Sequence, residues 1–396
     1  SKAFAEARPA EPLPSRVGSA EQSNTSIIYG KQLILKLFRR LQPGENPDVE
    51  IGRFLTDTAH FSHIPRFYGE IATTSAAGEK TTTAMLQGLV ANQGDGWQWF
   101  LDQLAGFFAA VADLPAPQKS QAPSFLRVDA PIAEVEQHSR TSLQAAELLG
   151  KLTAELHLAL ATPTSNPAFS GETFTSDDLA RDARRIDAQI TSTLEALKAK
   201  LSTLKDITAD HAALLLSRRI DLFARANAIT DLAAAGQRIR IHGDYHLGQT
   251  LRTAGSGGDD GDFILLDFEG EPARPLAERR QKQSPLKDVA GMIRSLSYAA
   301  YTGLDNYLGA NPEMAKTTYS ERLGAWAKAW ENSASAAFLR AYRNAIAALP
   351  ALLPSPEQAQ VLLEAYLLEK ALYELLYELN NRPTWLRIPL SGILTI

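Results

Sequence analysis

Short apolar runs separated by polar turns characterise the first ninety residues of the chain. The turn residues Gly30-Lys31 between two such runs are typical of a β-hairpin. Asn46-Pro47-Asp48 predicts the start of a helix that continues to about Thr58, because proline suits the first helical turn. Four strands are expected, at residues 26–29, 33–38, 66–71 and 81–87. The pattern therefore predicts a small twisted sheet with one helix.

From Trp97 onward the apolar positions recur with the three- and four-residue spacing of amphipathic helices. Helical segments are expected at residues 97–114, 133–161, 176–235 and 288–380. Residues 238–270 interrupt this pattern with short strand-like runs around two polar loops. The predicted fold class is therefore α+β, a small β-rich part followed by a large, mainly helical part.

Composition narrows the classes of protein to which the chain can belong. Apolar residues make up 45% of the 396 residues and charged residues 21%, which excludes a largely disordered chain. Forty basic against 45 acidic residues give a net charge of −5, so a nucleic-acid partner is not expected. No apolar run approaches the ~18 residues of a membrane span, so a membrane partner is not expected either. The absence of cysteine excludes disulfides and thiolate chemistry and fits a cytoplasmic location.

The interruption holds the densest polar pattern. Residues 238–241 predict a strand, which leads into the polar loop His242–Gln249. A second apolar strand, residues 263–266, leads into Asp267. Asp244 and Asp267 lie 23 positions apart (267 − 244), and a hairpin between them would bring both carboxylates to one end of a small sheet.

Phosphoryl transfer requires this layout. One carboxylate accepts the proton of the attacking hydroxyl, while a second carboxylate and an amide oxygen hold Mg²⁺ on the phosphates. Asp244 fits the first role, and Gln249 with Asp267 fits the second, since Mg²⁺ prefers oxygen ligands. The alternative is that these aspartates only cap turns. Two such motifs in order, each preceded by an apolar strand, favour the catalytic interpretation.

The two motifs also carry a family resemblance. His-Gly-Asp-x-His-x-x-Gln (242–249) followed by Asp-Phe-Glu-Gly-Glu-Pro (267–272) resembles the aminoglycoside-phosphotransferase-like branch of the protein-kinase fold, and Gln249 in place of Asn resembles the maltokinases. The resemblance covers residues 19–389. It implies a bilobal kinase-like fold and ATP- and Mg²⁺-dependent phosphorylation of the anomeric hydroxyl of maltose, giving maltose 1-phosphate for α-glucan (glycogen) synthesis. The expected domains are an N-lobe at 1–91, with 1–15 as a linker-like lead-in, and a C-lobe at 92–396.

Lys36 is a candidate ATP ligand because it interrupts the apolar strand Leu-Ile-Leu-Lys-Leu-Phe, where a charge is costly without a partner. The alternative is a lysine on an edge strand that points to solvent and prevents pairing with another chain. The resemblance implies that Lys36 binds the α- and β-phosphates, with Glu50 as its ion-pair partner. It also implies phosphate contacts from Ser23, Asn24, Thr25 and Ser26, and adenine contacts from the backbone of Gln87 and Leu89. The chain has no G-x-x-x-x-G-K-[S/T] motif, which excludes a P-loop NTPase.

The acceptor site is expected on the last long helix and beside the catalytic loop. Four residues there share one helix face through i, i+3, i+4 and i+7 spacing: Lys370, Tyr373, Glu374 and Tyr377. Charged groups can hydrogen-bond sugar hydroxyls while tyrosine rings pack on the sugar, although such a stripe can also belong to a core. The resemblance adds Glu269 and His246 as acceptor contacts, and His246 can alternatively steady the catalytic loop.

Other functions remain open from the sequence. A glucosamine or aminoglycoside kinase would share the fold and the nucleotide motifs, because acceptor choice depends on side chains grafted on the scaffold. A non-catalytic sugar or nucleotide sensor is the alternative from another class. The chain begins with Ser1, not Met, and has little sequence before the region of resemblance. A trehalose synthase domain, fused upstream or associated, is therefore an expected partner.

Overall fold

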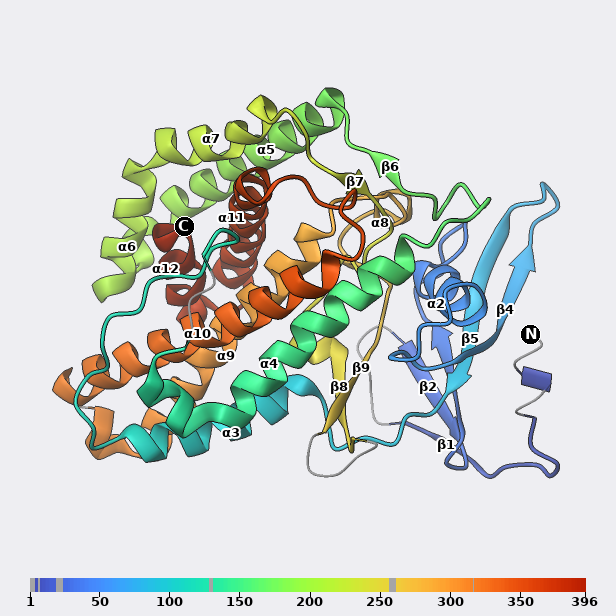
Figure 1. The fold of residues 1–396 in the computed structure, drawn as a ribbon, viewed down its shortest axis with the longest axis horizontal. Helices are drawn as coiled ribbons and strands as arrows, with labels where there is room; N and C mark the ends of the chain where they lie inside the picture. Colours follow the sequence, from blue (N-terminus) through green and yellow to red (C-terminus); the bar gives the residue numbers. More distant parts are fainter. Residues whose placement is uncertain (1–3, 6–7, 19–23, 128–130, 256–260, 316) are drawn as a thin grey trace. The chain divides into compact units, whose positions relative to one another are not determined.

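The computed structural model describes residues 4–5, 8–18, 24–127, 131–255, 261–315 and 317–396 (Figure 1). The strands are β1 (Ser15–Val17), β2 (Asn24–Tyr29), β3 (Leu33–Phe38), β4 (Phe67–Thr74), β5 (Lys80–Gly88), β6 (Glu172–Thr173), β7 (Gln237–Arg238), β8 (Thr250–Thr253) and β9 (Asp262–Leu265). The helices are α2 (Pro47–Asp57), α3 (Gly96–Val111), α4 (Ala133–Leu160), α5 (Ser176–Lys200), α6 (Asp206–Ser217), α7 (Arg219–Asn227), α8 (Leu276–Arg279), α9 (Leu286–Ala310), α10 (Thr317–Ile346), α11 (Pro356–Asn381) and α12 (Arg387–Thr395). The predicted α+β class is confirmed.

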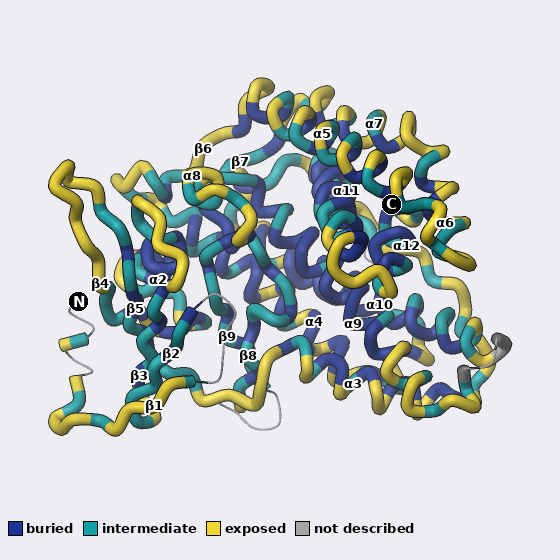
Figure 2. The backbone as a smooth tube through the Cα atoms, turned by 180° about the vertical axis from the view of Figure 1, so that it is seen from behind, coloured by how far each residue is buried: buried dark blue, intermediate teal, exposed yellow. Residues whose placement is uncertain are grey.

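Five antiparallel strands in the order β1-β2-β3-β5-β4 form the N-terminal sheet. Gly30 makes the tight turn between β2 and β3 with a φ of 56°, a left-handed conformation that glycine adopts without steric cost. Register pairs Ser26 of β2 with Lys36 of β3. The four predicted strands are confirmed, but β2 begins at Asn24. Residues 24 and 25, which precede the predicted strand, are therefore part of it. The far end of β4 is exposed (Figure 2).

Helix α2 forms where the sequence predicts it. Asn46 caps the helix by accepting a hydrogen bond from the Asp48 N–H at 2.8 Å, and Pro47 occupies the first turn. Val49 of α2 joins residues of the sheet in a buried apolar cluster, Phe38, Val49, Phe67 and Met85. This packing fixes which face of α2 is turned toward β3.

The hairpin that follows the catalytic-loop motif is present as β8 and β9, paired from Thr250↔Leu265 to Thr253↔Asp262. The predicted strand at 238–241 is mostly wrong, because β7 covers only Gln237–Arg238. Ile239 makes one isolated bridge with Gln283.

By packing, the chain divides into two compact units. Unit 1 contains Ser1–Gln98, Leu156–Ser170 and Ile239–Gln283, and unit 2 contains Trp99–Glu155, Gly171–Arg238 and Ser284–Ile396. The two sequence motifs, at 242–249 and 267–272, thus belong to unit 1 together with the N-terminal sheet. The lobes at 1–91 and 92–396, with a lead-in at 1–15, remain a prediction about the kinase-like architecture.

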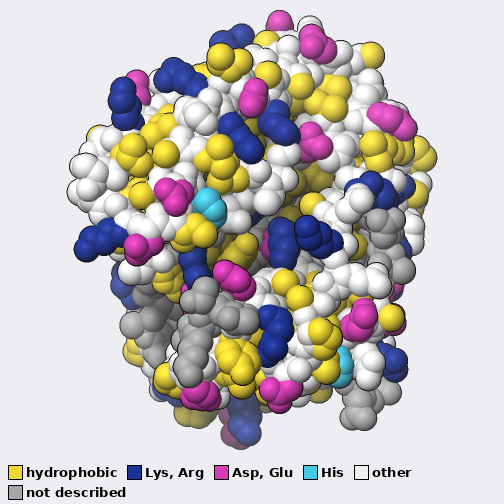
Figure 3. Space-filling view, turned by 90° about the vertical axis from the view of Figure 1, so that its left-hand side faces the viewer, with side chains coloured by type: hydrophobic (Ala, Val, Ile, Leu, Met, Phe, Trp, Pro, Cys, Tyr) yellow, Lys and Arg dark blue, Asp and Glu magenta, His cyan; other side chains and the backbone are white. Residues whose placement is uncertain are grey.

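Unit 2 is mainly helical, with α9 and α11 among its most buried segments (Figure 2). Aromatic side chains of α3 and α10 interlock: Phe107 lies edge-on to Trp326 with ring centroids 6.0 Å apart, and Phe100 lies against Trp330 at 6.2 Å. Figure 3 shows the side at the left of Figure 1, where basic and acidic side chains are interspersed.

Among the described residues, none of the helices combines the length and the apolar character that a bilayer crossing requires.

Candidate active site

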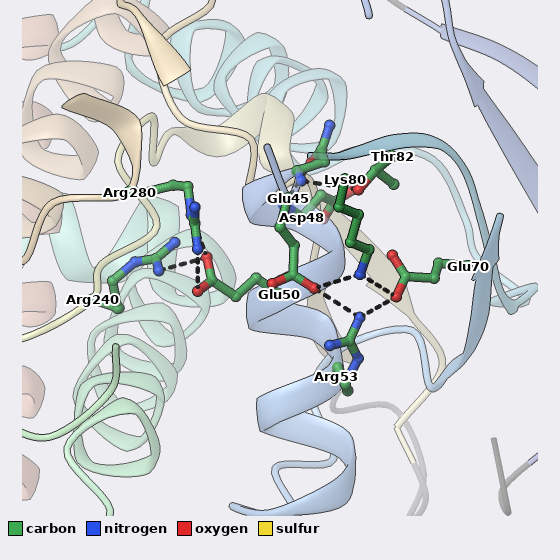
Figure 4. A network of polar contacts seen from close by, with 10 residues as sticks. Glu45, Asp48, Glu50, Arg53, Glu70, Lys80, Thr82, Arg240 and Arg280 are labelled. Carbon is green, nitrogen blue, oxygen red and sulfur yellow. Dashed lines mark hydrogen bonds and ion pairs between the residues drawn. The ribbon is translucent and has the colours of Figure 1, made fainter. Parts of the chain in front are cut away.

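Lys36 in β3 forms an ion pair with Asp48 in the first turn of α2. Lys36 Nζ lies 3.3 Å from Asp48 Oδ2, and the two side chains are only 10% and 4% exposed. This partner explains why a charge is tolerated in an apolar strand. The predicted pairing of Lys36 with Glu50 is wrong. Glu50 lies two positions further on, about 200° around the helix, where its carboxylate meets Arg240 and Arg280 (Figure 4).

Asp48 also contacts the segment after β9. Its Oδ1 accepts a hydrogen bond from the Phe268 N–H at 3.0 Å, so one carboxylate links Lys36 to the residue that follows Asp267. Sequence reasoning missed Asp48 as a site residue. The sequence could have indicated Asp48 as an acidic residue in the first turn of the helix that follows the Lys36 strand. Glu50 lies in the same turn and is also acidic, so the sequence did not distinguish the two.

Asp267 is held in an unusual environment. Its backbone φ is 64°, which is uncommon outside glycine but accessible to Asp and Asn. Gln249 Nε2 donates to Asp267 Oδ2 at 3.2 Å, so the two predicted Mg²⁺ ligands lie together. Asp267 Oδ1 is buried and has no hydrogen-bond partner among the described residues. Burial raises the pKa of Asp267, and the Lys36 charge opposes that shift. Such a carboxylate is stabilised by a cation.

Carboxylate oxygens of Asp48, Asp267 and Glu269 all lie within 4.8 Å of one another. Burial, followed by the charges of Asp267 and Asp48, raises the pKa of Glu269 to about 7. Asn24 Nδ2 donates to Glu269 Oε1 at 3.1 Å. A cluster of hard oxygen donors with an unsatisfied carboxylate oxygen fits Mg²⁺. Glu269 was predicted to contact the acceptor, and that role remains a prediction.

The predicted catalytic loop, residues 242–249, is held in place by its two histidines. A hydrogen bond of 2.8 Å joins His242 Nε2 to the Leu266 carbonyl oxygen, and the His242 ring lies 4.8 Å from that of Phe268. His246 Nδ1 accepts from the Gly248 N–H at 3.1 Å and so caps the short turn that carries Gln249. His246 therefore steadies the loop, as one alternative predicted. The nearby charge of Asp244 contributes to the raised pKa of Asp267.

The predicted phosphate loop is only partly described, since Ser23 lies outside the described residues. Asn24 and Ser26 are buried in β2, and Arg39 Nε donates to Thr25 Oγ1 at 3.1 Å. Ser26 lies directly opposite Lys36 in the adjacent strand. Phosphate binding by this segment remains a prediction.

The two predicted adenine contacts lie at and just beyond the end of β5. Gln87 is buried and lines a small cavity together with Asp48, Met85 and Asp267, so the structure brings it close to the carboxylates. The Leu89 N–H donates to the Gln32 carbonyl oxygen at 2.8 Å and is not available to adenine in this conformation. An adenine contact by the Leu89 N–H would require that bond to break.

The predicted acceptor residues on α11 belong to unit 2. Glu374 accepts two hydrogen bonds from Arg294, at 2.9 and 2.7 Å, and both side chains are largely buried. The ammonium of Lys370 lies 5.0 Å from the centre of the Tyr373 ring. Tyr377 is 47% exposed. Three of the four residues thus remain partly accessible on one helix, while Glu374 is occupied by a guanidinium.

The chain is similar to known proteins that carry the same name. No protein-family profile matches the sequence. The chain is 25% identical over 376 residues to a protein named glucosamine kinase from Streptacidiphilus jiangxiensis, across 93% of this chain and 70% of the relative. A protein of the same name from Mycolicibacterium smegmatis is 27% identical over 375 residues, across 94% of this chain and 76% of the relative.

A solved structure of a glucosamine kinase superimposes with a TM-score of 0.69 at 22% identity, covering 98% of this chain and 78% of the other. This chain has the glucosamine kinase fold. Another solved structure named glucosamine kinase, in complex with glucosamine, ADP and inorganic phosphate, gives a TM-score of 0.66 at 23% identity, covering 96% of this chain and 79% of the other. The kinase-like fold predicted from the two sequence motifs is therefore confirmed.

Proposed function

We propose that the chain is an ATP- and Mg²⁺-dependent kinase that phosphorylates a sugar hydroxyl. The observation that carries the proposal is the buried Lys36–Asp48 pair joined through Phe268 to Asp267, whose carboxylate lies beside Gln249 and has one unsatisfied oxygen. A phosphoryl-transfer site needs these groups together, a lysine for phosphates and oxygen ligands for a cation. The relatives named glucosamine kinase support the same class of reaction.

Each residue has a distinct role in this reaction. Asp244 orients the acceptor hydroxyl and takes its proton as the oxygen attacks the γ-phosphorus, and the bond from that phosphorus to the β–γ bridging oxygen breaks. Lys36 neutralises charge on the α- and β-phosphates. Asp267 and Gln249 would hold Mg²⁺, which supplies positive charge to the transferring phosphoryl group. Asp48 keeps Lys36 extended toward the phosphates.

The acceptor in our proposal is maltose, phosphorylated at the anomeric hydroxyl to give maltose 1-phosphate for α-glucan synthesis. The charge balance on α11 supports a neutral acceptor. Glu374 is paired with Arg294, and Glu378 is bound by Arg382 at 2.9 and 2.7 Å. On this helix, an acceptor ammonium would have to compete with Arg294 for Glu374 and with Arg382 for Glu378. On the same helix, Lys370, Tyr373 and Tyr377 would bind hydroxyls and the faces of sugar rings.

Glucosamine is the second candidate acceptor, because both curated relatives carry the name glucosamine kinase. Glutamates paired with arginine can still bind an amine if the arginine shifts. A trehalose synthase, fused or associated, belongs to the maltose version of the proposal, and the reading frame upstream of Ser1 tests for it.

An acceptor panel distinguishes the candidates. ADP release is measured with Mg²⁺-ATP and maltose, glucosamine, glucose or an aminoglycoside as acceptor, with the Asp244→Asn variant as the blank. We expect the largest kcat/KM with maltose, and a product whose phosphate is on the anomeric carbon. Preferential turnover of glucosamine would replace maltose by the second candidate. Nucleotide binding without turnover on any acceptor would indicate a sensor instead of a kinase.

A further inference from the structure

Glu50, Arg240 and Arg280 form a buried ionic cluster on the face of α2 that is turned away from Lys36. Glu50 Oε2 accepts from Arg240 Nη1 at 2.7 Å and from Arg280 Nε at 3.0 Å, and Oε1 accepts from Arg280 Nη2 at 3.0 Å (Figure 4). The side chains of Glu50 and Arg240 are 6% and 1% exposed. All three residues lie in unit 1. The cluster joins α2 to two segments that are distant in sequence.

Arg240 connects this cluster to the catalytic loop. It lies two residues before His242, and its guanidinium carbon is 5.5 Å from the centre of the Phe169 ring. Phe169 in turn stacks on Phe54 of α2, with ring centroids 3.9 Å apart and an interplanar angle of 4°. Arg240 therefore contacts α2 through an ion pair and, indirectly, through an aromatic stack.

The energetics argue against a purely stabilising role. Burying a charge pair has a desolvation penalty that often cancels its attraction, so such pairs add little net stability compared with an apolar replacement. The penalty for Arg240 is only partly offset by Glu50, because its Nε and Nη2 are buried without hydrogen-bond partners among the described residues. The effect that distinguishes the cluster from an apolar contact is directional, since its charged hydrogen bonds hold α2 against the segments that carry Arg240 and Arg280.

The opposite face of the same helix carries Asp48, which bonds Lys36 and the Phe268 N–H. A shift of α2 would therefore move the Lys36 partner and the segment of Asp267 relative to the loop that carries Asp244. A misplacement of about 1 Å at a reacting centre can reduce the rate by about 10²-fold. The cluster is placed to prevent such a shift.

We propose that Glu50, with Arg240 and Arg280, is a positioning cluster that couples α2 to the catalytic loop and thereby aligns the Lys36–Asp48 pair with Asp244. The proposal rests on the proposed kinase function for its effect on rate. Its structural content is independent of turnover, because it concerns the bond between the Phe268 N–H and Asp48.

The test compares Glu50→Gln with Glu70→Gln. Glu70 of β4 is the matched control, because it joins the sheet to α2 through an ion pair with Arg53 of the helix at 2.6 Å. It also pairs with Lys80 of β5 at 2.7 Å, and none of these residues belongs to the catalytic loop. We expect Glu50→Gln to lower kcat by about tenfold or more with each KM within about twofold. Glu70→Gln should keep its kcat even if its melting temperature falls as much as that of Glu50→Gln, or more. An unchanged kcat in Glu50→Gln, measured at a temperature where it is folded, would overturn the proposal.

One further measurement does not depend on the proposed activity, and a second uses a milder change in the cluster. Amide hydrogen exchange should speed up at Phe268 in Glu50→Gln and not in Glu70→Gln. Unchanged exchange at Phe268 contradicts the coupling whether or not the protein turns over sugar.

Arg280, whose side chain is 35% exposed, allows a milder change. Arg280→Lys should retain more of kcat than Arg280→Gln, because a lysine still reaches Glu50 with a charge. Equal losses in both variants would also contradict the proposal.

Discussion

Replacing Asp244 with Asn is expected to lower kcat by about 10²–10⁴-fold, the usual contribution of a positioned general base. Asparagine keeps the size of the side chain but cannot accept the proton of the acceptor hydroxyl. Nucleotide affinity should remain within a few-fold of the unchanged protein, because Lys36, Asp48 and Asp267 are untouched. The measurements are ADP release at saturating acceptor and nucleotide binding by calorimetry.

Asp262→Asn is the matched control for this change. Asp262 lies at the start of β9, and its carboxylate is 3.2 Å from His63 Nε2, so it belongs to the same hairpin but has no place in the proposed chemistry. Its kcat should be unchanged. If Asp244→Asn retains full activity, Asp244 is not the base and the role assigned to the His-Gly-Asp motif is wrong.

Replacing Asp267 with Asn is expected to produce a loss of at least about 10³-fold in kcat/KM at moderate Mg²⁺. The cation contributes several kcal/mol of charge stabilisation, and each 1.4 kcal/mol is a factor of ten in rate. Asparagine is the suitable replacement because it tolerates the positive φ of 64° at this position. The half-saturating Mg²⁺ concentration should rise, which a titration of activity against Mg²⁺ measures.

The melting temperature of Asp267→Asn, measured with and without Mg²⁺, serves as the control for this second change. Asp267 is buried and one of its oxygens lacks a partner, so removing its charge should leave the melting temperature unchanged or higher when no cation is present. Added Mg²⁺ should raise the melting temperature of the original protein and not that of Asp267→Asn. An unaltered Mg²⁺ dependence would exclude Asp267 as a ligand.

Much of the site could be predicted from local sequence. The β2–β3 turn follows from Gly30, the start of α2 from the Asn46-Pro47 cap, and the Gln249–Asp267 contact from two apolar runs joined by a hairpin. In each case, the residues that determine the feature are close in the chain. The strand predicted at 238–241 was mostly wrong, because Arg238 pairs with Glu172 and Ile239 makes only one bridge, with Gln283. The local pattern does not reveal such backbone partners, which are distant in the chain.

The sequence by itself determined the kinase-like order of elements, the lysine on an apolar strand and the pair of motifs with Asp244 and Asp267. Only the tertiary structure decided that Asp48 and not Glu50 is the partner of Lys36. Both are acidic and both lie in the first turn of α2, so local pattern cannot separate them. The packing of Val49 against the sheet sets the rotation of the helix, which turns Asp48 toward β3 and Glu50 toward Arg240 and Arg280.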